Sequence, residues 1–392
     1  MRYVARESGL VVAEREGPGV VRPELWLPKK RPGRRGFNLP PIREPYKDLP
    51  PLEAFGVAGA FATTMLGSGS GVTPMGLFGG NCKQWVRSDL GITIGTDPYG
   101  TGATLQAVTL TGSIAAPADF YLEITFTGSR GVATYKYGAN GSAGAMIETG
   151  VLTSASHACI GALAGLTINF PVGTYTNGDN YKGVISQWSD QSGNGNHYVQ
   201  SSSTAAPFYE LTAYNGKPDL HFASGATWMT CTSLILGTGN DTPFSVFIAA
   251  SVDAVTGNRV LFGMGNTGLA NPLYDLQVDS SGPTWGFSKR DDSGTVKTCQ
   301  GGVANTLRHY FSLINDGQTQ SFYIDGTLIA LTNSGDLNVG ATTLNRMSLG
   351  ARVQAAISLV LACRIAEVWG IDRAATAVEL NAAHSYFASR YP

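Results

Sequence analysis

The sequence predicts an all-β protein, and three observations carry that prediction. Glycine accounts for 50 of the 392 residues, while only 14% of residues are charged. Apolar and polar residues alternate with a period of two in many short segments, for example at 120–126 and 166–170. Clusters of Asn, Gly, Asp and Ser separate these segments. Such a chain suits short strands joined by tight turns, and its length allows two or three domains.

Residues 1–52 differ in composition from the rest of the chain. They hold 11 of the 27 Lys and Arg residues, 9 of the 19 prolines and 6 acidic residues. Because each proline removes a backbone donor and biases the preceding residue towards extended geometry, we expect an extended basic arm. The residues that we expect to make its contacts are Trp26, Lys29, Lys30, Arg31, Arg34, Arg35 and Phe37.

Three interpretations of this basic segment compete. A nucleic-acid-binding tail would carry more charge and would lack the interleaved Trp and Leu residues. A solvated linker would not need those apolar residues. We favour an assembly arm that orders against a neighbouring subunit or an acidic surface. Nucleic acid is therefore not the partner that we expect.

The next two segments are a linker and a small domain. Residues 53–82 are small, apolar and then glycine-rich, which predicts a linker with a short helix near 52–66. Residues 83–182 contain alternating segments at 104–110, 120–126, 132–137 and 166–170 with turn signals between them. We expect this second segment to be a small β-sandwich.

Residues 183–392 predict a larger sheet-built domain that ends in a helix. Strand patterns at 244–250 and 309–315 read as interior strands, and Asp325-Gly326 supplies the turn of a hairpin at 320–329. Thr376 and Glu379 have the spacing of a capping box, followed by an apolar stripe from Val378 to Tyr391. We expect this helix to lie against the sandwich.

The run from Trp188 to Gly195, Trp-Ser-Asp-Gln-Ser-Gly-Asn-Gly, is followed by Pro207-Phe208 and by the turn Asn215-Gly216-Lys217-Pro218. In this order and spacing the second half of the chain resembles laminin-G-like, concanavalin A-like jelly-roll domains. That family contains sugar binders, adhesins and spacers. The segments at 131–137, 165–170 and 173–181 also resemble modules of phage tail and other virion appendage proteins. The resemblances imply a jelly roll on a virion protein.

Catalytic motifs are missing from the sequence, so we expect no enzymatic activity. Glycosidases that resemble this fold carry a Glu-x-Asp-x-x-Glu strand, and none occurs here. The nearest acid pairs are Asp275 with Asp279 and Asp291 with Asp292. The five cysteines are scattered without a Cys-x-x-Cys pair, which favours free thiols over zinc or a disulfide framework.

Calcium is the one cofactor that the sequence suggests. Asp190, Asn194 and Asn196 place oxygen ligands on a tight loop. By analogy with the resembled family, Glu367 could face that loop. The alternative is that Asp190 and the two Asn side chains only cap the turn, and we favour that alternative. Trp188 is expected in the core.

Sugar binding needs an exposed aromatic platform with polar neighbours. Trp228, Tyr274 and Trp285 lie near loop-rich segments, and Arg290 is close in sequence. These four residues are the predicted carbohydrate-binding set, although each aromatic ring could instead pack inward.

Together these features predict a structural virion protein of a bacteriophage, in the tail or as a capsid decoration. The arm would anchor it to other virion subunits, and a lectin-like domain would attach to a host-surface glycan, as a homo-oligomer. A decoration or adaptor subunit that binds no sugar and a bacterial cell-surface adhesin are the alternatives. We expect neither a transmembrane helix nor a secretory signal, and we expect synthesis in the host cytoplasm.

Overall fold

The computed structural model describes residues 2–5, 11–14, 73–139, 146–223, 226–233, 236–279 and 282–392. The chain divides into two units, Met1–Val57 and Ala58–Pro392. Within the first unit, β1 (Arg2–Ala5) and β2 (Val11–Glu14) form an antiparallel pair. The predicted arm contacts between Trp26 and Phe37, and the helix expected near 52–66, lie outside the described residues.

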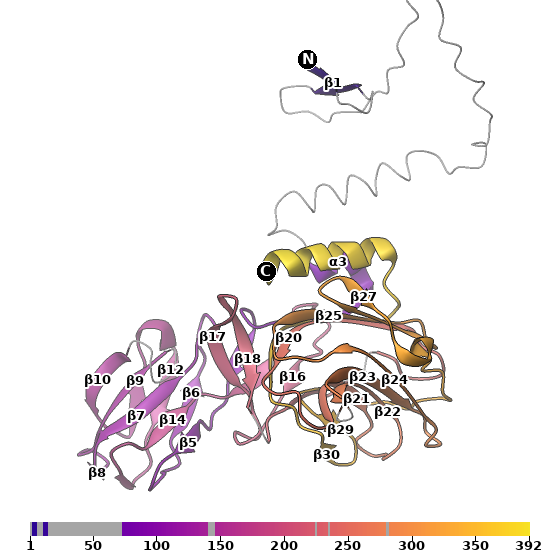
Figure 1. Cartoon of the computed structure of the whole chain (residues 1–392). Helices are drawn as coiled ribbons and strands as arrows, with labels where there is room; N and C mark the ends of the chain where they lie inside the picture. Colours follow the sequence, from indigo (N-terminus) through magenta and orange to yellow (C-terminus); the bar gives the residue numbers. More distant parts are fainter. Residues whose placement is uncertain are drawn as a thin grey trace, which may run out of the picture. The chain divides into compact units, whose positions relative to one another are not determined.

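Two large antiparallel sheets form most of the second unit (Figure 1). The nine-stranded sheet has the order β24 (Val296–Val303), β23 (Thr284–Arg290), β22 (Leu273–Asp279), β21 (Arg259–Gly265), β28 (Arg346–Leu349), β19 (Met229–Cys231), β16 (Tyr198–Val199), β15 (Ile185–Trp188) and β4 (Ile92–Ile94). The eight-stranded sheet has the order β17 (Phe208–Tyr214), β18 (Lys217–Phe222), β31 (Cys363–Ile371), β20 (Phe244–Val252), β25 (His309–Asn315), β26 (Gln320–Ile324) and β27 (Thr327–Ile329), and β3 (Cys82–Arg87) also pairs with β31. The predicted all-β fold is confirmed.

Aromatic side chains from both sheets meet in one core. Trp285 of β23 lies 4.7 Å from Phe311 of β25 between ring centroids, and Phe287 of β23 lies 4.9 Å from Phe322 of β26. Trp188 is also fully buried, as its place before the turn predicted. Each sheet turns one face to this core. The centre of the eight-stranded sheet is buried on both faces, since Val246 and Ile248 of β20 enter this core while Phe247 and Ala249 pack in the cluster with α3.

A smaller set of sheets follows β4 in the chain. The first has the order β10 (Met146–Leu152), β9 (Thr134–Gly138), β7 (Tyr121–Phe126), β14 (Asn180–Lys182) and β5 (Tyr99–Thr101). The second has the order β11 (Ser156–Ala158), β12 (Leu166–Asn169) and β6 (Thr109–Gly112), and β13 (Thr174–Tyr175) pairs with β8 (Gly128–Ser129). The 3-10 helix η2 (Gly161–Leu163) precedes β12.

The predicted domain boundary at residue 83 is corrected by the strand pairing. β3 pairs with β31, and β4 pairs with β15, so both belong to the large sheets. The small sheets are therefore an insertion between β4 and β15. The chain leaves and re-enters the large sandwich at adjacent points, since the Gly95 N–H donates to the Val184 carbonyl at 2.8 Å.

Short helices and one long helix complete the second unit. They are α2 (Pro74–Phe78), η1 (Gly79–Asn81), η3 (Thr332–Gly335) and α3 (Ala377–Arg390), and a further hairpin joins β29 (Arg352–Val353) to β30 (Ile357–Ser358). α3 begins with the predicted capping box, in which Thr376 and Glu379 bond each other's backbone N–H groups. Leu380, Ala383 and Phe387 of α3 are buried against the eight-stranded sheet.

The predicted hairpin turn at Asp325-Gly326 is confirmed. Ile324 pairs with Thr327 across it, and both turn residues have positive φ, 49° at Asp325 and 78° at Gly326. A two-residue turn with positive φ at both positions matches the twist of the flanking strands.

All five cysteines are buried and free. Burial raises the pKa of the Cys159 and Cys299 thiols to about 12. Within the described ranges, no helix combines the length and the apolar character needed to cross a membrane.

A buried carboxylate fastens α3 to the eight-stranded sheet. Glu367 of β31 accepts hydrogen bonds from the indole Nε1–H groups of Trp85 at 2.9 Å and Trp369 at 2.7 Å. The hydroxyls of Tyr386, at 3.0 Å, and Tyr391, at 2.8 Å, donate to it from the helix and its C-terminal end. Burial raises the pKa of Glu367, although these donors stabilise its charged form.

Replacing Tyr386 with Phe removes one donor from this buried carboxylate and leaves the ring in place. We expect the free energy of unfolding to fall by about 1–3 kcal/mol, as for a lost hydrogen bond to a charged group. Urea unfolding measures it, with the exposed Ser385→Ala as the control on the same helix. Equal midpoints for Tyr386→Phe and the wild type would contradict this role for Glu367.

Candidate functional site

The predicted aromatic platform does not form. Tyr274 and Trp285 are each only 1% exposed, and both side chains belong to the core between the sheets. The Tyr274 ring packs edge-on against Phe244 at 5.0 Å. The physical reason is the pleat, because these two residues occupy core-facing positions of β22 and β23.

The other two residues of that set have structural contacts. Trp228 is half-buried, and its backbone N–H donates to the Ala205 carbonyl at 2.9 Å. The Arg290 guanidinium donates to the carbonyls of Asn271 at 2.5 Å and Ala270 at 2.6 Å. Arg290 therefore holds the loop before β22 and is not directed at a ligand.

The side chains proposed as calcium ligands make hydrogen bonds that organise the loop. The Asp190 carboxylate accepts the backbone N–H groups of Trp85, Ser192 and Asn196 at 2.9–3.0 Å. The Asn194 and Asn196 amides donate to the carbonyl of Lys83. Glu367 lies instead in the network beneath α3.

These contacts are the ones that the favoured turn-capping alternative predicts. A carboxylate that accepts three backbone N–H groups organises the loop and ties it to β3. Among the residues that the structure describes, no three His, Cys, Asp or Glu side chains form a group that could hold a metal.

A different set of polar side chains lies on the outer face of β22, β23 and β24, opposite the core. We call it the β22–β24 face. It comprises Asp275, Gln277, Asp279, Gly286, Ser288 and Gln300. Asp275, Gln277, Gly286 and Ser288 are buried, and Asp279 and Gln300 are partly exposed. Gln277, Gly286 and Gln300 are direct cross-strand neighbours in one row.

Gly286 leaves the middle of this row without a side chain. A Cβ atom built on Gly286 would lie 3.6 Å from Cγ of Gln277 and 3.7 Å from both Oδ2 of Asp279 and Cγ of Gln300. These three side chains therefore surround the position above Gly286. The Gln300 amide donates to Asp279 Oδ2 at 2.6 Å, which fixes two of them relative to each other.

One border of the face is held by a buried ion pair. Arg352 of the β29–β30 hairpin bonds Oδ2 of Asp275 through Nε at 2.6 Å, and its Nη2 lies 3.4 Å from Oε1 of Gln277. Burial raises the pKa of Asp275 to about 6, and the Arg352 charge opposes that rise. The hairpin thus presents a cation beside the row of amides.

Sequence reasoning missed Gln277, Gly286 and Gln300 because it searched for aromatic residues. The available signal was the alternation Tyr274-Asp275-Leu276-Gln277-Val278-Asp279, in which every second residue is polar. The partner row in β24 carries no comparable pattern, so only strand pairing brings Gln300 to Gly286.

A second polar group lies at the ends of β17, β18, β20 and β31. We call it the strand-end cluster, and it comprises Glu210, Asp219, His221, Asp253 and Arg364. His221 bridges Glu210 and Asp253 at 2.8 Å on each ring nitrogen. The Arg364 guanidinium pairs with Glu210 and lies 3.7 Å from Asp219.

Asp219 is the member of the strand-end cluster whose burial is not compensated by hydrogen bonds. It is fully buried, and neither carboxylate oxygen has a hydrogen-bond partner among the described residues. Burial raises its pKa to about 7, against the opposing charge of Arg364. The pKa of Glu210 falls to about 2, chiefly through its hydrogen bond with His221.

Comparison with known proteins gives distant structural likenesses. No protein-family model matches the chain, and no curated protein matches it. The Ruminococcus gnavus IT-sialidase CBM40 bound to alpha2,3 sialyllactose is 16% identical over 39% of this chain and 94% of its own, with a TM-score of 0.31. The Trypanosoma rangeli sialidase in complex with 2,3-difluorosialic acid is 14% identical over 51% of this chain and 30% of its own, with a TM-score of 0.38.

A leech intramolecular trans-sialidase is similar at the same level. It is 17% identical over 37% of this chain and 24% of its own, with a TM-score of 0.31.

Replacing Asp219 with Asn tests whether ionisation of this buried carboxyl group destabilises the fold. An aspartate whose folded-state pKa lies above its unfolded value stabilises the fold below about pH 4, and that stability is lost as pH rises through about 7. We therefore expect the stability of Asp219→Asn relative to the wild type to rise by about 2 kcal/mol between pH 5 and pH 8.

Urea unfolding at the two pH values measures this difference, with the exposed Asp97→Asn as the control. A difference between Asp219→Asn and the wild type that is the same at both pH values would show that Asp219 is not a buried acid of raised pKa.

Proposed function

We propose that the chain is a structural virion protein of a bacteriophage whose laminin-G-like sandwich attaches to a host-surface glycan through the β22–β24 face. The sequence supports the virion part of this proposal through the proline-rich cationic arm and the resemblance to virion appendage modules. The all-β architecture is compatible with a displayed lectin-like domain. The chemistry of one sheet face supports the sugar-binding part.

The observation that carries the proposal is the row centred on Gly286. A sugar presents hydroxyl groups that both donate and accept hydrogen bonds. The amides of Gln277 and Gln300 do both, and the Asp279 carboxylate accepts. Gly286 is buried between these side chains, so the partly exposed Asp279 and Gln300 are the groups that a sugar would contact first.

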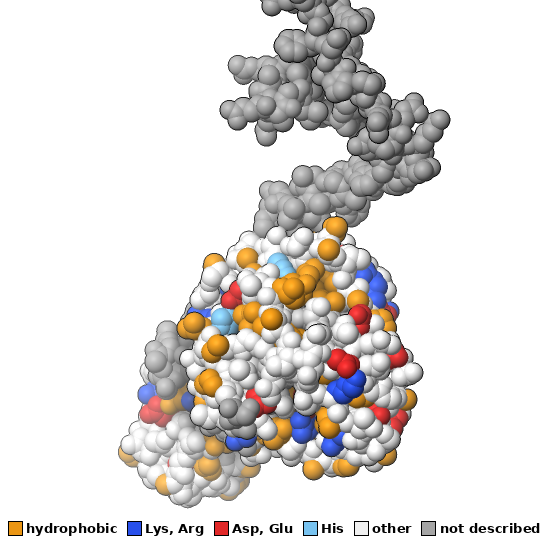
Figure 2. Space-filling view, turned by 45° about the vertical axis from the view of Figure 1, so that its right-hand side comes forward, with side chains coloured by type: hydrophobic (Ala, Val, Ile, Leu, Met, Phe, Trp, Pro, Cys, Tyr) orange, Lys and Arg blue, Asp and Glu red, His pale blue; other side chains and the backbone are white. Residues whose placement is uncertain are grey.

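Charged side chains are sparse on the face that Figure 2 shows, which does not favour a nucleic-acid ligand there. Figure 2 shows one face of the molecule, on which blue and red side chains are few and lie singly or in small mixed groups among uncharged ones. A nucleic-acid-binding surface would concentrate Lys and Arg on one side. On the face shown, the cationic side chains do not form a continuous patch.

Binding without hydrolysis is the chemistry that the acids of this face favour. Asp275 and Asp279 lie four residues apart on β22, which places their Cα atoms about 13 Å apart along the strand. Glycosidases hold their two carboxyl groups at about 5–9.5 Å. In addition, Asp275 is paired with Arg352, and Asp279 accepts from Gln300. We therefore propose no enzymatic role.

A decoration or adaptor subunit is the second candidate, and exposed apolar residues of the small sheets favour it. Phe126 is 57% exposed and Leu152 is 54% exposed. Both are cross-strand neighbours of Thr134, one on each side. Apolar side chains grouped in this way suit contact with another protein.

Glycan-array binding tests the β22–β24 face. We expect Gln300→Ala to weaken binding about tenfold, because it removes one polar contact to the sugar. We expect Gly286→Leu to abolish binding by covering the row, while Gly286→Ala keeps the fold, since a Cβ there makes only ordinary contacts.

The matched control is Gln318→Ala, an exposed glutamine of another loop. Unchanged binding by both Gln300→Ala and Gly286→Leu would remove the β22–β24 face from consideration. Absence of glycan binding by the wild type, together with recovery in purified particles, would favour the adaptor.

Deleting residues 1–52 tests the anchoring arm. We expect the full chain to be recovered with purified phage particles and the shortened chain to be lost from them, with its glycan binding retained. Immunoblotting of gradient-purified particles measures incorporation, and Gln300→Ala should be incorporated normally. Incorporation of the shortened chain at the wild-type level would refute the proposed arm.

A further inference from the structure

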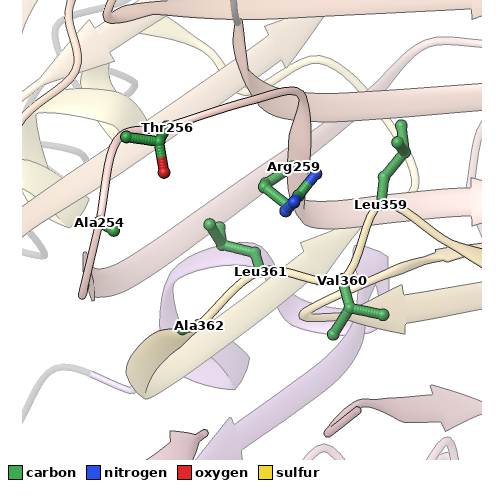
Figure 3. A pocket seen from close by; sticks show the side chains of 7 residues that line it. All are labelled: Ala254, Thr256, Arg259, Leu359, Val360, Leu361 and Ala362. Carbon is green, nitrogen blue, oxygen red and sulfur yellow. The ribbon is translucent and has the colours of Figure 1, made fainter. Parts of the chain in front are cut away.

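A cavity of about 500 Å³ lies beyond the point where β20 and β31 separate. Val252 and Cys363 are the last paired residues of these strands at that end. Ala254, Thr256 and Arg259 line one side of the cavity, and residues 359–362 line the other (Figure 3). Its volume is in the range that holds small organic ligands in proteins.

The wall formed by residues 359–362 is apolar and is held in a strained conformation. Leu359 has a φ of 49°, which is rare for a bulky side chain. The Val260 N–H donates to the Leu359 carbonyl at 2.9 Å, and Val260 forms a parallel bridge with Val360. Leu361 is buried at the back of the same segment. The surrounding strands therefore maintain a wall of Leu, Val and Leu.

Among the described residues that line the cavity, Arg259 is the one that carries a charge. Its Nη1 donates to the carbonyl of Asn258 at 2.8 Å. Among the described residues, no carboxylate forms an ion pair with its guanidinium, although most other arginines of the sandwich have one. The remaining guanidinium donors are free for an anion.

The loop between β20 and β21 is shaped around this guanidinium. Gly257 has a φ of 74°, and a Cβ there would lie 3.3 Å from Nη1 of Arg259. Glycine thus lets the arginine lie back against the loop at the edge of the cavity.

The nearest acid on this loop is already engaged elsewhere. Asp253 binds Nε2 of His221 at 2.8 Å and lies 3.6 Å from Nε of Arg364. Its backbone N–H donates to the Ala362 carbonyl, which joins the two sides of the cavity. The positive charge of Arg259 therefore remains available to the cavity.

We propose that this cavity binds a small organic anion, with its carboxylate on Arg259 and its apolar body against Leu359, Val360 and Leu361. Arginine suits this task because its planar guanidinium can form two parallel hydrogen bonds to a carboxylate. Thr256 adds a hydroxyl on the same side. The site is separate in composition from the β22–β24 face, and it does not depend on glycan binding.

Isothermal titration with hexanoate tests the proposal, with 1-hexanol as the neutral probe of the same length. We expect hexanoate to bind with a Kd of about 1 mM, and hexanol to bind at least about tenfold more weakly. We expect Arg259→Gln to lower hexanoate affinity about tenfold without changing hexanol binding.

Two further variants separate the site from general effects. Arg308→Gln changes another exposed arginine, which contacts Tyr214 and Asn215, and should bind hexanoate as the wild type does. Ala254→Phe fills the cavity from an exposed position and should abolish binding with the unfolding midpoint unchanged. The proposal is overturned by no hexanoate binding, by equal binding of hexanol and hexanoate, or by Arg259→Gln binding hexanoate like the wild type.

Discussion

The requirement that two sheets share one core governs most of what the chain can present to its surroundings. Each strand of β22–β24 gives alternate residues to that core, so Trp285 and Phe287 pack in it while Gly286 and Ser288, which are also buried, lie on the opposite face of the sheet. The polar character of the outer face is therefore a consequence of the same pleat that packs Trp285 against Phe311. The strand register that decides which residues enter the core therefore also decides which residues lie on the opposite face.

Hydrogen bonds accepted by two buried carboxylates connect the sandwich to its peripheral elements. Asp190 holds the loop after β15 and accepts the backbone N–H of Trp85. The indole of the same Trp85 donates to Glu367, which in turn receives two tyrosine hydroxyls from the C-terminal region. One residue of β3 thus joins the loop, the eight-stranded sheet and α3. Such fully bonded buried acids are specific connectors, since each oxygen has defined donors.

Much of the architecture follows from local sequence signals. The Asp325-Gly326 turn, the capping box of Thr376 and Glu379, and the buried Trp188 were all predictable because each depends on neighbouring residues. The place of β3 and β4 was not, because their partners β31 and β15 lie about a hundred or more residues away in sequence. The predicted aromatic platform was wrong for a related reason. Tyr and Trp occur both in cores and at binding sites. Only the register of β22 with β23 decides that Tyr274 and Trp285 face the core.

The position of the small sheets has a consequence for how the molecule is built. Ile94 and Ile185 are paired neighbours on β4 and β15. The inserted segment between them is therefore connected to the large sandwich at two adjacent points. Joining those two strands by a tight turn would give an ordinary β-hairpin at the edge of the nine-stranded sheet. Replacing the inserted segment with another would therefore leave every other strand connection of the large sandwich unchanged.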